Sequence, residues 1–241
     1  MDKLFIVIPA YNEEQNIESV IRQWYPYVDS HDKGEGHSTE SRLVIADSGS
    51  SDNTHNIILE LKKTFPQIEI ISNTLRYHGP KVIALYKYAI ANGADYIFQT
   101  DGDGQTNPAE FKSFWLDRAN YVGIFGYRKV RGDGKDRALV EKAVCFLVHL
   151  FFGVKVPDAN APFRLMNARA LSKYMDKFRD DYNLPNIIIT AFFAKFESNI
   201  VFREISFKAR SAGTSSVNIA RIMKIGMKAL YDFYVFRKAI L

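Results

Sequence analysis

Apolar runs and helical segments alternate over the first hundred residues, and this rhythm limits the fold more than any other feature of the chain. The expected strands cover residues 4–8, 42–47, 68–72 and 95–100. The expected helices between them cover residues 12–24, 53–63 and 80–91. Strands that are apolar throughout and separated by helices favour a parallel sheet covered on both faces. The sequence therefore predicts an α/β protein with a mostly parallel central sheet flanked by helices.

Sheets of this kind bind their ligands beyond the carboxyl ends of the strands. Residues 9–13, 47–54 and 101–105 occupy those places, and all three segments are rich in polar side chains. Asn12 is predicted to be the N-cap of the first helix, because Asn caps well and acidic residues follow it. Residues 29–41 contain no apolar side chain and are interpreted as a surface insertion.

Composition narrows the class of protein. The chain has 241 residues, 47% of them apolar and 24% charged, which suits one large globular domain. The net charge of +5 suits an anionic substrate or a membrane surface and is too weak to indicate a nucleic-acid partner. The single cysteine, Cys145, lies in an apolar run and is predicted to be a buried, inert thiol.

The cysteine count and the N-terminus point to a cytoplasmic protein. One cysteine excludes a disulfide within the chain and favours a reducing compartment. The apolar run at residues 4–8 is too short for a signal peptide. No segment approaches the ~20 apolar residues needed to cross a bilayer. We expect a soluble or peripheral protein, located in the cytoplasm or at the cytoplasmic face of a membrane.

The stretch QTDGDGQTNP, residues 99–108, places Asp101 and Asp103 one residue apart between glycines. Like charges this close repel, so a positive group is expected between them. An Asp-Gly turn is the ordinary alternative. An EF-hand calcium loop is excluded, because Thr106 and Lys112 stand where that loop requires Gly and Glu.

Several segments, taken in order and spacing, resemble family 2 glycosyltransferases, which have the nucleotide-sugar-binding GT-A fold. They are AYNEE, ADSGSSDNT, GPKVIALYKYAI and TDGDGQTNP. Three later segments are similar to those of the polyprenyl-phosphate branch, typified by dolichyl-phosphate mannose synthase: GYRKVRGDGKDR, DANAPFRLMN and KARSAGTSS. The resemblance suggests a GT-A domain over residues 1–218 and an amphipathic helical segment over residues 219–241.

The resemblance implies an inverting, metal-dependent transfer of a hexose from UDP or GDP. Asp101 and Asp103 would hold Mg²⁺ or Mn²⁺, with an amide oxygen from Gln105, and Asp103 would be catalytic. Asp101 would also contact the donor. The positions that match nucleotide-binding residues are Pro9, Tyr11, Glu13, Asp47 and Lys81.

The acceptor decides the rest of the mechanism. A lipid phosphate is already ionised and needs cations, whereas a sugar hydroxyl needs a carboxylate base. The arginines beyond residue 125 that qualify are Arg128, Arg131, Arg137, Arg164 and Arg210, of which Arg131 is the least favoured. Arg128, Arg137 and Arg210 align with phosphate-binding positions of the branch. Asp158 is the predicted base for a hydroxyl; with a lipid phosphate it would orient the donor sugar or an arginine.

Two departures from the family pattern bear on this choice. Asp47-Ser48 replaces the usual Asp-Asp, and Ala161-Pro162 replaces Ser-Gly before Phe163. The preferred acceptor is a polyprenyl phosphate, and the first alternative is a saccharide hydroxyl in cell-surface polysaccharide synthesis. A non-catalytic nucleotide-sugar-binding subunit of a membrane complex is disfavoured, because the acidic pair is intact.

Helical spacing continues in the C-terminal segment. Its apolar positions are Ile222, Ile225, Ala229, Phe233, Phe236 and Ile240, and the cations beside them are Arg221, Lys224 and Lys228. This pattern is typical of a helix that packs on its own domain or a partner subunit, or one that lies on an anionic membrane. Of the five histidines, His78 is interpreted as a loop residue and His149 as part of a packed helix face.

Overall fold

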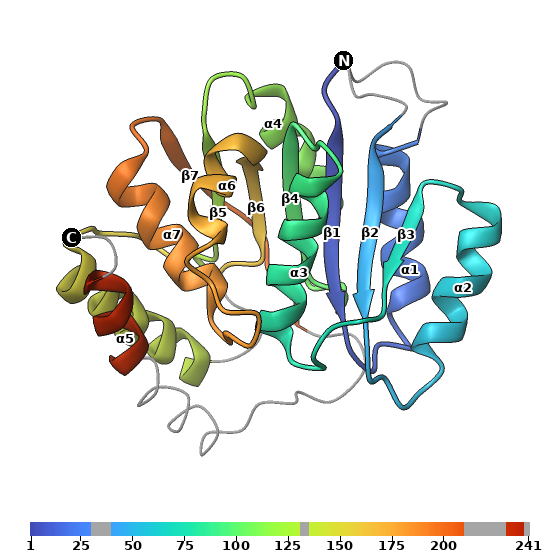
Figure 1. Cartoon of the computed structure of the whole chain (residues 1–241), viewed down its shortest axis with the longest axis horizontal. Coiled ribbons are helices and arrows are strands. Elements are labelled where there is room, and N and C mark those ends of the chain that lie inside the picture. The colour runs from blue at the N-terminus through green and yellow to red at the C-terminus, as the bar shows by residue number, and fades with distance from the viewer. Residues whose placement is uncertain (30–39, 131–134, 210–229, 239–241) are drawn as a thin grey trace.

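The computed structural model describes residues 1–29, 40–130, 135–209 and 230–238 (Figure 1). A seven-stranded sheet forms its centre, in the order β3-β2-β1-β4-β6-β5-β7. The strands are β1 (Leu4–Ala10), β2 (Arg42–Asp47), β3 (Ile68–Ile71), β4 (Tyr96–Thr100), β5 (Gly123–Tyr127), β6 (Phe163–Asn167) and β7 (Ile200–Glu204). Only β6 runs antiparallel to its neighbours β4 and β5. The prediction of a mostly parallel sheet is confirmed.

Helices cover both faces of the sheet (Figure 1). They are α1 (Ile17–Trp24), α2 (Thr54–Thr64), α3 (His78–Ala91), α4 (Phe111–Leu116), α5 (Lys135–Phe152), α6 (Ala168–Met175) and α7 (Pro185–Phe196), with 3₁₀ turns η1 (Tyr25–Tyr27) and η2 (Pro108–Glu110). Side chains of β1 alternate between two core clusters, as the period of a strand requires. Leu4 and Ile6 pack with α1, α2 and α4, whereas Phe5 and Val7 pack with α3, α5, α6 and α7.

One edge of the sheet gathers most of the predicted site. The carboxyl ends of β1, β2, β4 and β5 lie there, because these strands are mutually parallel. Strand β6 runs the other way, so the loop before it, residues 158–162, reaches the same edge. The chain passes from β1 outward to β2 and β3 on one side and returns at β4 on the other. This switch point between β1 and β4 is where such sheets bind ligands.

The prediction that Asn12 caps the first helix is wrong. Helix α1 begins at Ile17 and its N-cap is Asn16. Asn12 instead has a φ of 54°, a left-handed conformation that Asn adopts more readily than most residues. Its Oδ1 accepts a hydrogen bond of 2.8 Å from the backbone N–H of Ser51. Asn12 therefore ties the loop after β1 to the loop after β2.

The described part of the C-terminal segment is a helix over residues 230–238 that packs on the domain's own core. Phe233 contacts Phe151 and Phe152 at the end of α5. Phe236 contacts Phe178 and Tyr182, the second at a centroid distance of 5.0 Å. The other predicted positions of this segment lie outside the described residues. Within the described ranges no helix combines the length and apolar character needed to cross a bilayer.

Candidate active site

The loops after β1 and β2 are held together at the predicted nucleoside end. The backbone N–H of Glu13 donates to Thr54 Oγ1 at 2.8 Å, and the Glu13 carboxylate accepts from Asn16 Nδ2 at 2.8 Å.

Pro9 lies inside β1. It comes after Val7, which is the last residue of β1 that pairs with β4. Its missing N–H therefore costs no ladder hydrogen bond toward β4.

Asp47 lies at the end of β2 and its side chain is 2% exposed. Its two carboxylate oxygens accept from Ser50 Oγ at 2.5 Å and meet His55 Nδ1 at 3.0 Å. Sequence reasoning missed His55, which is the second residue of α2 and has no motif of its own. A nucleoside that bonds to Asp47 has to share the carboxylate with these two side chains.

Lys81 is buried at the same edge, with 1% of its surface exposed. Its Nζ donates to the Ala10 carbonyl at 2.5 Å and lies 5.1 Å from the Tyr11 ring centroid. Desolvation lowers the pKa of Lys81 to about 8, although Asp47 partly opposes this. The described hydrogen bond goes to a neutral carbonyl, so the ammonium is poorly compensated. Such a cation suits an anionic ligand.

The two acidic residues of the 99–108 segment follow β4 directly. Asp101 is partly exposed, whereas Asp103 is buried and accepts from the backbone N–H of Gln105 at 3.2 Å. Gln105 Nε2 donates to the Lys208 carbonyl at 2.7 Å. Two carboxylates and an amide are an oxygen donor set that fits Mg²⁺ or Mn²⁺. In the described ranges no group of three or more His, Cys, Asp or Glu residues forms a complete metal site, so substrate oxygens would have to supply the remaining ligands.

His78 is not the loop residue that the sequence suggests. It opens helix α3, and its Nε2 lies 3.1 Å from Asp101 Oδ1. Desolvation by itself lowers the pKa of His78, but the Asp101 and Asp103 carboxylates outweigh it and raise the pKa above its ordinary value. A basic side chain thus does lie beside Asp101. No spacing rule could have identified it, because the contact joins residues 23 positions apart.

Arg128, just beyond β5, is clamped by two acidic side chains. Its Nε and Nη2 donate to Asp158 at 2.7 and 2.9 Å, and Nη2 also lies 3.4 Å from Glu141 Oε2. Burial alone would raise the pKa of Asp158, but Arg128 outweighs it and holds the pKa below its ordinary value. Burial raises the pKa of Glu141. Sequence reasoning missed Glu141, which lies on α5 within an apolar run.

Glu141 also explains the behaviour of the single cysteine. Cys145 Sγ lies 3.5 Å from Glu141 Oε1, one helical turn away. Burial raises the pKa of the Cys145 thiol to about 12, and the neighbouring carboxylate adds to this effect. The thiol stays protonated at neutral pH, as an inert cysteine does. It is only partly buried, which corrects the expectation of full burial.

Arg164 is not at the site, contrary to the sequence expectation. It is 1% exposed and donates to the Ala161 and Asn186 carbonyls and to Thr190 Oγ1. Its guanidinium fixes the loop before β6 and cannot reach a nucleotide without unpacking the core. Arg137 lies in the first turns of α5. Arg131 and Arg210 lie outside the described residues.

The segment after β7 returns to the acidic loop. Phe207 forms an antiparallel bridge with Thr106, and the backbone N–H of Lys208 donates to the Gln105 carbonyl at 2.9 Å. The described residues are interrupted after Ala209, immediately before Arg210. Lys208, two residues before Arg210, therefore contacts the acidic loop at Gln105.

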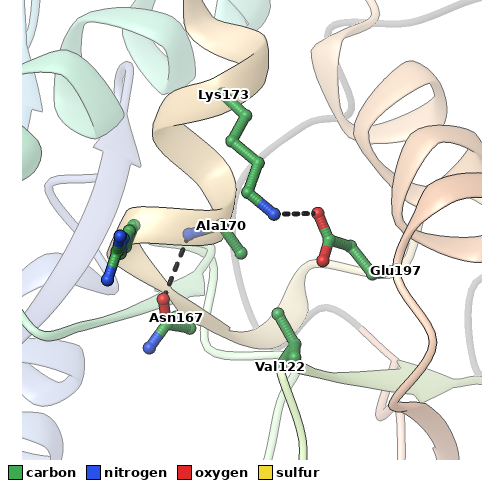
Figure 2. A pocket seen from close by; sticks show the side chains of 6 residues that line it. Val122, Asn167, Ala170, Lys173 and Glu197 are labelled. Atoms are coloured by element: carbon green, nitrogen blue, oxygen red, sulfur yellow. Dashed lines mark hydrogen bonds and ion pairs between the residues drawn. The ribbon is translucent and has the colours of Figure 1, made fainter.

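A pocket of about 370 Å³ lies at the opposite edge of the sheet (Figure 2). Asn167 at its wall ends β6 and accepts from the Ala170 N–H at 3.1 Å, and Lys173 pairs with Glu197 at 2.9 Å. These contacts cap α6 and join it to the end of α7. The polar residues that line this pocket stabilise the fold, and the pocket is separate from the acidic loop.

Comparison with known protein families identifies the family to which the chain belongs. The sequence model described as "Glycosyl transferase family 2" matches residues 5–199. The chain belongs to glycosyl transferase family 2. It is therefore a glycosyltransferase, and the matched residues cover strands β1 to β6, apart from Leu4, and end just before β7.

Relatives within the family include an uncharacterised protein of Methanocaldococcus jannaschii, which is 27% identical over 94% of this chain and 97% of that protein. The UDP-N-acetylglucosamine–dolichyl-phosphate N-acetylglucosaminyltransferase of Methanococcus voltae is 28% identical, over 74% of this chain and 75% of that enzyme. The undecaprenyl-phosphate 4-deoxy-4-formamido-L-arabinose transferase of Shewanella sediminis is 25% identical, over 93% of this chain and 65% of that enzyme.

Solved structures of the same architecture include glucosyl-3-phosphoglycerate synthase from Mycobacterium tuberculosis with Mn²⁺, UDP-glucose and phosphoglyceric acid. The TM-score is 0.66 at 17% identity, over 100% of this chain and 81% of that one. At this identity the likeness establishes the fold. The family 2 chain therefore has the GT-A fold that the sequence predicted.

Proposed function

We propose that the chain transfers a hexose, with inversion, from a UDP- or GDP-hexose to a polyprenyl phosphate, using Mg²⁺ or Mn²⁺. The observation that carries this proposal is that the carboxylate of Asp158 is buried and already paired with hydrogen-bond donors. Its carboxylate accepts from the side chain of Arg128 and from the backbone N–H groups of Arg128 and Asn160. A carboxylate that is buried, paired and lowered in pKa is a poor base for a sugar hydroxyl. An acceptor that is already ionised needs no base.

The names of the relatives support the same acceptor. Two relatives that match most of this chain are named as transferases acting on dolichyl or undecaprenyl phosphate. A third, the dolichyl-phosphate β-glucosyltransferase of Trichomonas vaginalis, is 26% identical over 45% of this chain and 33% of that enzyme. The sugars and lipids differ among these enzymes, so the donor sugar and the lipid chain are left to experiment.

The proposed roles follow the edge of the sheet from β2 to β5. Asp47 and Tyr11 contact the nucleoside, and Lys81 lies toward the diphosphate. Asp101 and Asp103 would hold the cation, which would supply charge stabilisation to the leaving diphosphate. The acceptor phosphate oxygen attacks the anomeric carbon, whose bond to the diphosphate oxygen breaks. No proton has to be removed in this step.

A donor-by-acceptor activity matrix tests the proposal directly. Purified protein is incubated with UDP- and GDP-hexoses against undecaprenyl phosphate, dolichyl phosphate and saccharide acceptors. Transfer to a lipid phosphate supports the proposal. Transfer confined to a saccharide hydroxyl replaces it with polysaccharide synthesis, and donor binding without transfer replaces it with a binding subunit.

Asp47→Ala should weaken donor binding more than it slows the chemical step. A nucleoside contact is far from the breaking bond and is made about equally in the ground and transition states. We expect KM for the donor to rise about tenfold or more with little change in kcat. Steady-state kinetics decide. If kcat collapses while donor affinity is unchanged, Asp47 acts on the chemistry instead.

Lys81→Met should stabilise the ligand-free protein at pH 7 and weaken donor binding. The folded-state pKa of about 8 lies below the ordinary value of 10.5, so burying the charged lysine destabilises the fold at every pH below 8. This penalty disappears as the pH rises from 8 toward 10.5. The gain in Tm over wild type should shrink across that range. Thermal unfolding at several pH values and nucleotide-sugar titration measure both effects; an unchanged Tm at pH 7 contradicts the prediction.

A further inference from the structure

The outward face of α5 forms a continuous stripe of exposed side chains. Leu139, Phe146 and Leu150 are 71%, 64% and 59% exposed, and they lie together on one helix instead of being scattered singly over the surface. Lys142, Ala143 and His149 are the other exposed residues of this stripe, so the interpretation of His149 as part of a packed helix face is wrong. Their spacing of three or four residues places all six on one side of the helix, along about 16 Å of its axis.

The charge of this α5 stripe has one sign. The structure describes the α5 side chains of residues 137–152, and Glu141 is the single acidic residue among them. Glu141 points the opposite way, into the Arg128 clamp. The stripe itself carries Lys142, and Lys155 follows it as an exposed cation. An apolar stripe with one cation within it and another beyond its end, and with no carboxylate among its described side chains, matches an anionic lipid surface better than a mixed-charge protein surface.

The helix over residues 230–238 adds exposed aromatic side chains and cations beside α5, and its one carboxylate, Asp232, is partly buried. Figure 1 shows the two helices side by side, and Phe233 joins them through Phe151 and Phe152. Its outward side chains include Tyr231, Tyr234 and Val235, all exposed. Arg237 and Lys238 are exposed at its end. Aromatic rings with cations at their edge are typical of the membrane–water interface.

We propose that the α5 stripe, together with the exposed side of residues 230–238, docks the enzyme on an anionic membrane surface. This proposal rests on the proposed function for its purpose, since a polyprenyl phosphate is presented at that surface. The opposite side of α5 holds Glu141 against Arg128, so one helix separates the lipid interface from the acceptor side of the site. The apolar stripe inserts at headgroup depth while the cations meet lipid phosphates.

Vesicle co-sedimentation tests the docking surface without any acceptor lipid. The probes are phosphatidylcholine vesicles with and without phosphatidylglycerol. Wild type should bind the anionic vesicles at low salt and release at high salt. The double variant Phe146→Ser/Leu150→Ser should bind about tenfold or more weakly. The matched control is Leu59→Ser/Leu116→Ser, which alters exposed leucines of α2 and α4, on the other face of the sheet, and should bind like wild type.

Each other outcome counts against the surface. Wild type that stays in the supernatant, or a stripe variant that sediments like wild type, overturns the proposal. A wild-type dimer that the stripe variant converts to monomer, with no vesicle binding, assigns the face to a second copy of the chain. Because the vesicles hold no polyprenyl phosphate, an error in the proposed acceptor leaves these results unchanged. Turnover with a short, water-soluble prenyl phosphate should be equal in wild type and the stripe variant, and its loss would show damage to the site instead.

Discussion

Replacing Asp103 by alanine should abolish hexose transfer, and replacing Asp101 should be nearly as damaging. Both carboxylates follow β4 in one short loop, and Asp103 is held in place by the backbone of Gln105. Under the proposed mechanism, both variants would lose the cation that offsets the charge of the leaving diphosphate. That stabilisation amounts to several kcal/mol of barrier, so kcat should fall roughly a thousandfold or more. Turnover with saturating donor and Mn²⁺ or Mg²⁺ measures the effect.

Metal binding separates this cause from general damage. Wild type should lose activity in excess EDTA and regain it when Mn²⁺ is restored, and Mn²⁺ titration should show weaker binding in both alanine variants. Asp180→Ala is a suitable control, because Asp180 is an exposed carboxylate whose ion-pair partner is Lys87, in the third turn of α3, and not a residue of the acidic loop. Full turnover in excess EDTA, with both alanine variants unimpaired, would show that the acidic pair has another role.

The first half of the fold followed from the sequence because its signals are local. Strand β2 occupies the predicted residues, and β1, β3 and β4 differ from prediction by at most two residues at any end. Strand β6 could not be placed in the same way. Its five residues, FRLMN, fit a parallel or an antiparallel neighbour equally well. Only pairing with β4 and β5 fixes its direction, and those contacts join residues far apart in the chain.

The residues of the candidate site also fall into two groups, those that a sequence motif could place and those that only tertiary contacts bring to the site. Asp101 and Asp103 follow a strand within one motif, so sequence order placed them correctly at the edge. Arg164 also belongs to a motif, but its guanidinium turns inward to the Ala161 carbonyl. Glu141 and His78 carry no motif and reach the site only through tertiary contacts with Arg128 and Asp101. A motif thus predicts where a residue lies along the sheet, whereas tertiary packing decides whether its side chain faces the ligand.

The acceptor can be identified by comparing Arg210→Ala with Asp158→Asn. If a lipid phosphate attacks, Arg210→Ala should be close to inactive while donor binding stays near normal. Arg210→Lys keeps the charge but loses the planar fork, so its activity should also be reduced. Asp158→Asn should keep measurable turnover, because it removes a charge that positions Arg128 and does not remove a base. Transfer is measured for each variant with a lipid phosphate and with a saccharide acceptor.

A control is needed because Asp158→Asn also loosens the clamp on Arg128. Glu141→Gln weakens the same clamp from its other side and leaves Asp158 intact. Under the lipid-phosphate mechanism Asp158→Asn and Glu141→Gln should each lose part of their activity, to a similar extent. Both should also have a lower Tm, since each leaves the buried Arg128 less well paired. Under a hydroxyl mechanism Asp158→Asn alone is inactive, because the reaction loses its general base. An inactive Asp158→Asn beside largely active Glu141→Gln and Arg210→Ala would therefore overturn the polyprenyl-phosphate assignment in favour of a saccharide acceptor.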